Sequence, residues 1–246
     1  MDGVESVRTD VLGVGFDSLS LEEAVAAGIE LMDKPGFHYA VTPNPEFILS
    51  AKKDEAFRTV LNGADLVLPD GIGVIYAAKI LGRPLTGRVT GVDFAQGLMA
   101  SMAATGKRLF LLGAKPGVAE QAADKLRQAH PGLIICGTHD GYFQEDAPVI
   151  EAIQNARADA VFVCLGAPRQ ELWMAQNGPA TGAKLAIGLG GCLDVFSGNV
   201  QRAPEAMQKL GLEWLYRLLK EPKRIGRMAK LPLILVDAAA ARLGGK

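Results

Sequence analysis

The strongest constraint on the fold is a repeated alternation of short apolar segments with amphipathic segments, separated by turns rich in glycine and proline. The apolar segments at 108–112 and 160–165 are each followed by a glycine and then by a helical pattern. Strands that are apolar along their length are buried on both faces, as in parallel sheets covered by helices on both sides. The sequence therefore predicts an α/β, Rossmann-like fold with a mainly parallel sheet.

The same alternation gives the expected elements. Strands are expected at 11–16, 37–41, 64–68, 108–112, 133–136, 160–165 and 184–189. Helices are expected near 20–32, 46–52, 55–61, 72–81, 92–104, 118–129, 146–157 and 169–177. The helix after Ser20 has the clearest start, because Ser20 and Glu23 have the spacing of a capping box.

The domain organisation follows from where the alternation stops. The 246-residue chain alternates from about residue 9 to 200 without a linker, which predicts one α/β domain over 1–203 and an appendage over 204–246. Residues 209–246 hold nine Lys or Arg and three Asp or Glu, although the whole chain has a net charge of only −1. The near-neutral total argues against a nucleic-acid partner, and the basic appendage predicts contact with an anionic surface.

The appendage also has an amphipathic pattern. One apolar helical stripe is formed by Leu210, Trp214, Leu215, Leu218 and Leu219. A basic amphipathic segment with Trp and Leu is typical of helices that lie on a membrane surface, which predicts a membrane-associating, helical appendage. The alternative is a C-terminal helix that packs its apolar stripe on the core and leaves its charges in solvent.

Several chemistries lack their characteristic residues. The three cysteines are far apart in sequence, which predicts reduced, buried thiols. None of the three histidines pairs with another at ligand spacing, so neither a metal nor another cofactor is expected. A Gly-x-Ser-x-Gly motif is missing, which argues against a serine hydrolase.

Candidate site residues lie where the predicted strands end. In open α/β sheets, ligands bind outside the carboxyl ends of the strands. Asp70 follows a buried strand and could act as a general base, although a turn or helix-cap role is an equal alternative. The loops Gly113–Gly117 and 188–191 follow strands and favour a ligand with phosphates, although a tight strand-to-helix turn is the commoner explanation.

Taken together, these segments resemble the WecG/TagA/CpsF glycosyltransferase family over residues 9–230. The resemblance is carried by Thr42-Pro-Asn44, Ala64-Asp-x-x-x-Pro-Asp70-Gly-x-Gly, Arg88-Val-Thr-Gly-Val-Asp93, Gly141-Tyr-Phe, Gly166-x-Pro168-Arg-Gln170-Glu171, Gly190-Gly-x-x-Asp194-x-x-x-Gly198, Arg202-Ala-Pro and Gly211-Leu-Glu-Trp-Leu-Tyr-Arg217. The motifs occur in order along nearly the whole chain.

This resemblance implies an enzyme that moves N-acetylmannosamine, or a related hexose, from a UDP-sugar to a sugar on a lipid diphosphate. It implies inversion at the anomeric carbon, no metal, and a peripheral location on the cytoplasmic face of the cell membrane. The pathways are those of teichoic acid and other cell-surface polysaccharides. The sequence leaves open which sugar is donated and whether copies associate as a homo-oligomer.

The resemblance also implies roles for individual residues. Asp70 would be the catalytic base. Substrate contacts would come from Thr42, Asn44, Arg88, Asp93, Gly113, Gly141, Tyr142, Gln170, Gly190, Gly191, Asp194, Arg217, Arg224 and Arg227. Gly141, Tyr142 and Asp194 would lie at the nucleotide end, whereas the appendage arginines and Arg88 would stabilise the leaving diphosphate.

Two other classes remain as alternatives. An NAD-dependent oxidoreductase would need Gly-x-Gly-x-x-Gly after the first strand, but that strand leads into Asp17-Ser-Leu-Ser. A non-catalytic membrane-surface adaptor would explain the basic appendage but not the polar residues at the strand ends.

Overall fold

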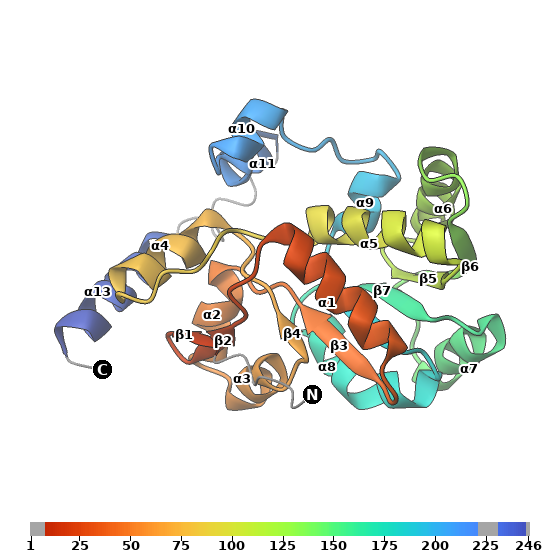
Figure 1. Ribbon diagram of the computed structural model, residues 1–246, viewed down its shortest axis with the longest axis horizontal. Coiled ribbons are helices and arrows are strands. Elements are labelled where there is room, and N and C mark those ends of the chain that lie inside the picture. Colours follow the sequence, from red (N-terminus) through yellow and green to blue (C-terminus); the bar gives the residue numbers. More distant parts are fainter. Residues whose placement is uncertain (1–7, 221–230, 245–246) are drawn as a thin grey trace.

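The computed structural model describes residues 8–220 and 231–244 (Figure 1). Its centre is a six-stranded sheet in which every neighbouring pair is parallel, with the order β4-β3-β8-β7-β5-β6. The strands are β3 (His38–Val41), β4 (Leu66–Val67), β5 (Arg108–Gly113), β6 (Ile134–His139), β7 (Ala160–Cys164) and β8 (Leu185–Gly188). The predicted parallel α/β sheet is confirmed.

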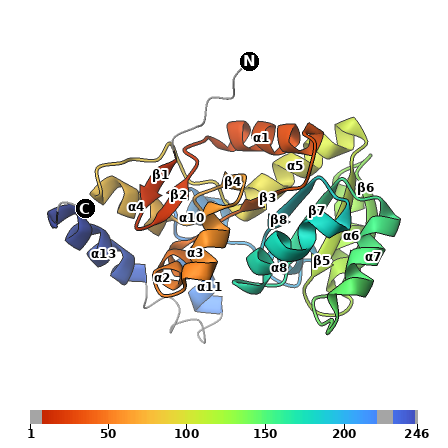
Figure 2. The same cartoon turned by 90° about the horizontal axis from the view of Figure 1, so that it is seen from below.

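The sheet separates two hydrophobic clusters. Successive side chains of a strand point to opposite faces, so Leu109 and Leu111 of β5 belong to one cluster, whereas Phe110 and Leu112 belong to the other. The first cluster includes α1 (Leu21–Asp33), α5 (Gly91–Thr105), α6 (Val118–Ala129) and α9 (Cys192–Phe196). The second includes α2 (Pro45–Ala51), α3 (Glu55–Asn62), α4 (Ile72–Ile80), α7 (Asp146–Ala156) and α8 (Arg169–Asn177). Figure 2 shows α1 and α5 on one side of the strands and α7 and α8 on the other.

The prediction of one strand at 11–16 is wrong. This segment is an antiparallel hairpin of β1 (Thr9–Val11) and β2 (Val14–Phe16), outside the main sheet. Leu12 and Gly13 have φ values of 56° and 92°, and two residues with positive φ form a tight turn suited to a hairpin. The chain therefore reverses inside an apolar run that looks continuous in the sequence.

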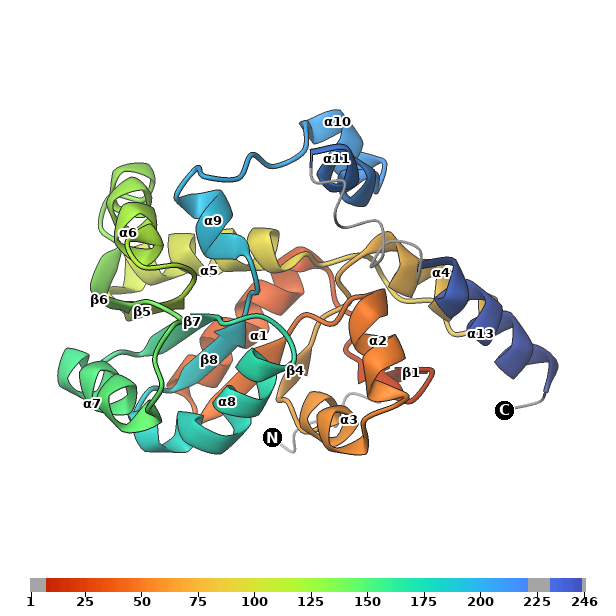
Figure 3. The ribbon, with the colours of Figure 1, turned by 180° about the vertical axis from the view of Figure 1, so that it is seen from behind.

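The described part of the appendage is helical, as predicted. Helices α10 (Glu205–Lys209) and α11 (Glu213–Lys220) lie at the top of the view in Figure 3, above α4. Helix α13 (Leu231–Leu243) packs along α4 and α2, with Ile234 and Ala238 fully buried. Lys52 forms an ion pair with Asp237, and Arg242 donates a hydrogen bond to the Leu81 carbonyl. Helix α13 thus packs on the core, but it is not the predicted stripe, of which Leu210 and Leu219 are 69% and 70% exposed. The membrane role of the appendage and the division at residue 203 stay predictions.

Within residues 8–220 and 231–244, no helix has both the length and the apolar character needed to cross a membrane.

Candidate active site

A cleft of about 490 Å³ opens at the carboxyl ends of β5, β6, β7 and β8. Five residues predicted from the sequence line it, namely Gly141, Tyr142, Gly190, Gly191 and Asp194. They come from two segments that are far apart in the sequence, the loop after β6 and the segment from the end of β8 into α9. The structure therefore brings the residues predicted for the nucleotide end into one place.

Gly113 does not line the cleft itself, but it directly precedes Ala114 and Lys115, which do. Its φ is +124°, and an added Cβ would lie 2.3 Å from the Cys164 carbonyl oxygen on the neighbouring strand. Only glycine allows this approach, after which the Ala114 N–H donates to the same carbonyl at 3.0 Å. The loop then enters α6 at Gly117, which has no side-chain cap, so backbone N–H groups are available at this helix start.

The loop after β6 is held by an arginine missing from the predicted set. Arg169 donates to the Gly141 carbonyl at 2.8 Å and to the Phe143 carbonyl at 3.4 Å, and its guanidinium lies 4.6 Å from the Phe143 ring centroid. Tyr142 between them is 64% exposed and lines the cleft. Arg169 belongs to a motif that carries the family resemblance, and its place in that motif could have identified it as a site residue.

Gln170 lies beneath the glycine loops, not on the cleft surface. It is 2% exposed, and its Oε1 accepts hydrogen bonds from the N–H groups of Gly166 and Gly190. Its Nε2 donates to Oε1 of Glu171 at 2.6 Å. Glu171 is fully buried, and this burial raises its pKa to about 7, against the opposing effect of the Gln170 hydrogen bond. The sequence analysis named Glu171 in a motif but did not include it among the site residues.

Asp70 follows β4 and lies beside the segment after β3, where its N–H donates to the Pro43 carbonyl at 3.1 Å. Its Oδ2 accepts a hydrogen bond from the Gly91 N–H at 3.3 Å. The N-cap of α4 is Gly71, without a side-chain cap, so Asp70 does not cap this helix. Gly91 is the first residue of α5, however, so a structural role at a helix start remains an alternative for Asp70. Thr42, at the end of β3, donates to the Gly188 carbonyl at 3.2 Å and would be 3.2 Å from a Cβ on Gly91. Asp70 and Thr42 therefore share one corner beside the cleft.

Asn44 is in the same strand-end loop and has a structural task. Its Oδ1 accepts hydrogen bonds from the N–H groups of Glu46 and Phe47, at 2.8 and 3.3 Å, and so caps the N-terminus of α2. A substrate contact by Asn44 would have to use its remaining polar groups, and this role stays a prediction.

Arg88 and Asp93 belong to a charge cluster, which we define as Arg88, Asp93, Arg202 and Glu213. Arg202 bonds to Asp93 at 2.7 Å and lies 3.7 Å from Glu213, whose other oxygen is 4.0 Å from Arg88. Arg88 also donates to the Gln208 carbonyl. The cluster ties α10 and α11 to the start of α5, and sequence reasoning included neither Arg202 nor Glu213 among the site residues.

The surroundings of Asp93 control its titration. Burial acts to raise the pKa of Asp93, but hydrogen bonds from Arg202 and Thr90 and the charges of Arg202 and Arg88 outweigh it. The pKa is therefore lowered from its usual value. The Thr90 hydroxyl, which also caps α5, is 2.6 Å from Asp93 Oδ2. Asp93 is thus ionised and engaged at neutral pH.

Three predicted arginines cannot be placed in this site. Arg224 and Arg227 lie outside the described residues, and so does the side chain of Arg217, whose backbone belongs to α11. Their roles stay predictions. Within the described ranges, no cluster of three or more His, Cys, Asp or Glu side chains is arranged to hold a metal ion.

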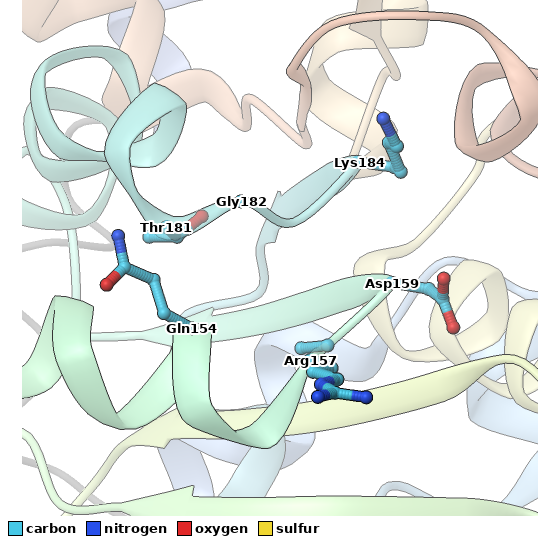
Figure 4. Close-up of a pocket in the computed structure, with 7 residues that line it drawn as sticks. Gln154, Arg157, Asp159, Thr181, Gly182 and Lys184 are labelled. Atoms are coloured by element: carbon cyan, nitrogen blue, oxygen red, sulfur yellow. The ribbon is translucent and has the colours of Figure 1, made fainter.

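A second cavity, of about 320 Å³, lies at the amino ends of the strands, opposite the cleft (Figure 4). It includes Asp159 and Lys184, which directly precede β7 and β8, together with Arg157 and Gln154 of the neighbouring helix and its end. No residue predicted from the sequence lines it. Since ligands of open α/β sheets bind at the carboxyl edge, the cleft beside Asp70 is the better candidate.

Residues 9–246 match the model of the glycosyl transferase WecG/TagA/CpsF family. The chain belongs to this family. It is a glycosyltransferase, which confirms the resemblance found in the sequence and sets aside the oxidoreductase and the adaptor.

Similar proteins carry a more specific name. The chain is 39% identical to an N-acetylglucosaminyldiphosphoundecaprenol N-acetyl-beta-D-mannosaminyltransferase of Bacillus spizizenii, over 79% of this chain and 76% of the relative. A Staphylococcus aureus protein of the same name is 32% identical over 96% of this chain and 94% of its own length. These names give both a donated sugar and an acceptor for the relatives.

Proposed function

We propose that this WecG/TagA/CpsF glycosyltransferase moves N-acetylmannosamine, or a related hexose, from a UDP-sugar to a sugar carried on a lipid diphosphate. The product would enter teichoic acid or another cell-surface polysaccharide. The names of the relatives support the sugar and the lipid-linked acceptor. The observation that carries the proposal is a cleft lined by glycine loops at the carboxyl ends of the strands. Asp70 and Thr42 lie outside its lining, and both contact residues at the neighbouring strand ends and helix start.

The proposed chemistry is a direct, inverting displacement. The acceptor hydroxyl attacks the anomeric carbon of the donor, and Asp70 takes the proton of that hydroxyl. The bond from the anomeric carbon to the UDP oxygen breaks, and UDP leaves with the bonding electron pair. One substitution at carbon, with attack opposite to the leaving group, inverts the configuration.

The leaving diphosphate needs positive charge or N–H groups, and the proposal requires no metal. Lys115 lines the cleft beside the start of α6, where backbone N–H groups can meet phosphate oxygens. Gly141, Tyr142 and Asp194 would hold the nucleotide end, and Arg88 and the appendage arginines would approach from the other side. The basic appendage would also hold the enzyme peripherally on the inner face of the anionic cell membrane.

A panel of donors tests this function. UDP-N-acetylmannosamine, its uronic acid, UDP-glucose and UDP-N-acetylglucosamine are each incubated with a lipid-diphosphate N-acetylglucosamine analogue, and the product is followed by mass spectrometry. We expect transfer from UDP-N-acetylmannosamine and a β-linked product. Transfer only from another donor would change the sugar, and a product that keeps the donor configuration would exclude the inverting displacement.

A ligand screen by thermal unfolding tests the nucleotide site separately. A ligand present at about 100 times its dissociation constant stabilises a protein by roughly 2.7 kcal/mol. We therefore expect UDP to raise the melting temperature and NAD to leave it unchanged. No shift with UDP at millimolar concentration would contradict the assignment of the cleft.

A further inference from the structure

One buried side chain connects the two loops on the floor of the cleft. The Oε1 atom of Gln170 accepts hydrogen bonds from the Gly166 N–H at 3.2 Å and from the Gly190 N–H at 3.0 Å. These two glycines follow the adjacent parallel strands β7 and β8, and both line the cleft. Gln170 therefore sets how the two loops are placed relative to each other.

Glu171 holds the other end of the same amide. Its Oε1 accepts from Nε2 of Gln170 at 2.6 Å, and the residue is 0% exposed. A Cβ on Gly188 would lie 3.0 Å from Gln170 Nε2 and 3.1 Å from Glu171 Oε1. The pair thus packs directly behind the end of β8, where glycine leaves the room that it needs.

The direction of this amide matters because its two ends differ chemically. Oε1 can accept from two N–H groups, whereas a flipped amide would direct its NH₂ donor at the same two N–H donors. An acceptor beside Nε2 selects the productive orientation. Among the residues that the structure describes, Glu171 supplies that acceptor, and its Oε2 has no hydrogen-bond partner.

We infer that Glu171 is a positioning residue of the donor cleft, which fixes the amide of Gln170 and, through it, both glycine loops for binding a nucleoside diphosphate. This inference rests on the proposed function, because it assumes that the cleft takes UDP. It concerns preorganisation: loops already held in the binding geometry lose less conformational freedom when the ligand arrives.

The surroundings of Glu171 also make its charge a usable probe. Helix α8 packs most closely against α3, η1 (Gly178–Thr181), β3, β7 and β8. Titratable or charged side chains on these elements are Glu55 and Arg58, which pair with each other, His38, which pairs with Asp65, Tyr39, which donates to the Val60 carbonyl, and Cys164. Within the described ranges, none makes an ion pair with Glu171. Ionisation of Glu171 would therefore place an uncompensated negative charge behind an anion-binding cleft.

The first experiment removes the acceptor. Glu171→Met keeps the length of the side chain and leaves Gln170 Nε2 without its partner, whereas Gln176→Met makes a similar change at an exposed position of the same helix. We expect Glu171→Met to weaken UDP binding about tenfold in calorimetry, and Gln176→Met to leave it unchanged. A folded Glu171→Met protein that binds UDP as tightly as the wild type overturns the inference. If the wild type itself binds no UDP, the proposed function fails instead.

A double-mutant cycle asks whether Glu171 acts through Gln170. The dissociation constant for UDP is measured for Glu171→Met, Gln170→Met and the double variant. If one residue acts through the other, the double variant binds no more weakly than Gln170→Met alone. Independent effects that multiply to about 100-fold would contradict this connection.

The conservative variant Glu171→Gln keeps the test decisive if the methionine variant does not fold. It retains an acceptor oxygen for Gln170 and carries no charge at any pH. We expect UDP affinity close to that of the wild type at pH 6. Between about pH 6 and 8.5, affinity should fall about threefold more for the wild type than for Glu171→Gln, because only the wild type gains the buried charge. Titration of UDP itself is common to both proteins, so identical pH profiles would overturn the inference.

Discussion

The cleft and the charge cluster are the two sides of the proposed site, and they are built by different interactions. The cleft is shaped by glycines, backbone carbonyls and the buried amide of Gln170, with Arg169 fixing one loop. The charge cluster joins Arg88 and Arg202 to Asp93 and Glu213, and so connects the appendage helices to the start of α5. The first resembles a rigid core, and the second a charged interface.

This difference predicts different responses to the solvent. Hydrogen bonds between buried neutral groups are not screened by salt, whereas partly exposed ion pairs weaken as ionic strength rises. The hydrogen bonds that hold the cleft loops in place should therefore be insensitive to salt. The appendage side should respond to both salt and pH, which suits a segment that is proposed to meet a charged membrane and a diphosphate acceptor.

The largest expected effect comes from Asp70, which lies between the two sides. Asp70→Asn keeps an oxygen for the Gly91 N–H but removes the base. We expect turnover to fall by about 10²–10⁴, with UDP affinity largely unchanged, because a positioned base contributes in this range. Asp124→Asn on the exposed side of α6 serves as the control. Turnover near normal in Asp70→Asn would mean that another group takes the proton.

A methyl group at Gly113 should damage the cleft side most. Gly113→Ala adds a Cβ 2.3 Å from the Cys164 carbonyl oxygen at a φ of +124°, and we expect a loss of about 4 kcal/mol in the free energy of unfolding. Gly117→Ala in the same loop also has a positive φ, +84°, but meets no atom within 4 Å. It should cost only about 1 kcal/mol. Equal losses in urea unfolding would show that close packing against β7 is unimportant.

Glu171→Gln should stabilise the protein at alkaline pH. The pKa of Glu171 is raised to about 7 by burial, so its folded state holds the proton while the unfolded chain, near its usual 4.5, has released it. Stability is therefore complete below about pH 4.5 and is lost as pH rises through 7, by about 3 kcal/mol. Glu171→Gln avoids this loss. Melting curves at pH 5 and 8.5 measure it, with Glu151→Gln on the exposed face of α7 as control. A constant difference across pH would refute this explanation.

The charge cluster should give a smaller effect that depends on salt. Arg202→Gln breaks the 2.7 Å contact with Asp93, and we expect a loss of about 2 kcal/mol at pH 7. Because the pKa of Asp93 is lowered in the folded protein, its stabilisation is present above its usual pKa and disappears as pH falls through the folded value. High salt should also reduce the loss.

An exposed pair provides the reference for this measurement. Arg58→Gln removes the surface contact with Glu55 and should change stability by less than about 1 kcal/mol. If Arg202→Gln costs no more than Arg58→Gln, or if its effect ignores salt and pH, then the charge cluster does not hold the appendage as described.

The smallest expected effect is that of a chelator. Neither side of the site is proposed to use a metal, so EDTA should leave the transfer rate unchanged. Loss of activity that returns with magnesium or manganese would show that a metal helps the diphosphate to leave. The site would then need a metal in addition to the cleft and the charge cluster.

The sequence by itself determined the layout of the fold and predicted several residues that line the candidate cleft. The apolar segments around β5 and β7 predicted a parallel sheet, because strands buried on both faces need apolar residues at every position. Ser20 and Glu23 predicted the start of α1, since a capping box is local, and both of its hydrogen bonds are present. Gly141, Gly190 and Asp194 follow from the rule that parallel strands bring their carboxyl ends to one edge.

Only the tertiary structure decided the contacts between distant segments. Thr42 reaches Gly188, and Arg88 reaches Gln208, across 146 and 120 residues, and no spacing in the sequence encodes such pairs. The turn at Leu12 was hidden in an apolar run because a hairpin depends on backbone angles that this run does not specify. The sequence placed Gln170 and Glu171 in a motif at the start of a helix and predicted Gln170 as a substrate contact, but it did not show that both are buried. Their burial, and hence the inferred role of Glu171, arises from the loops that fold over them.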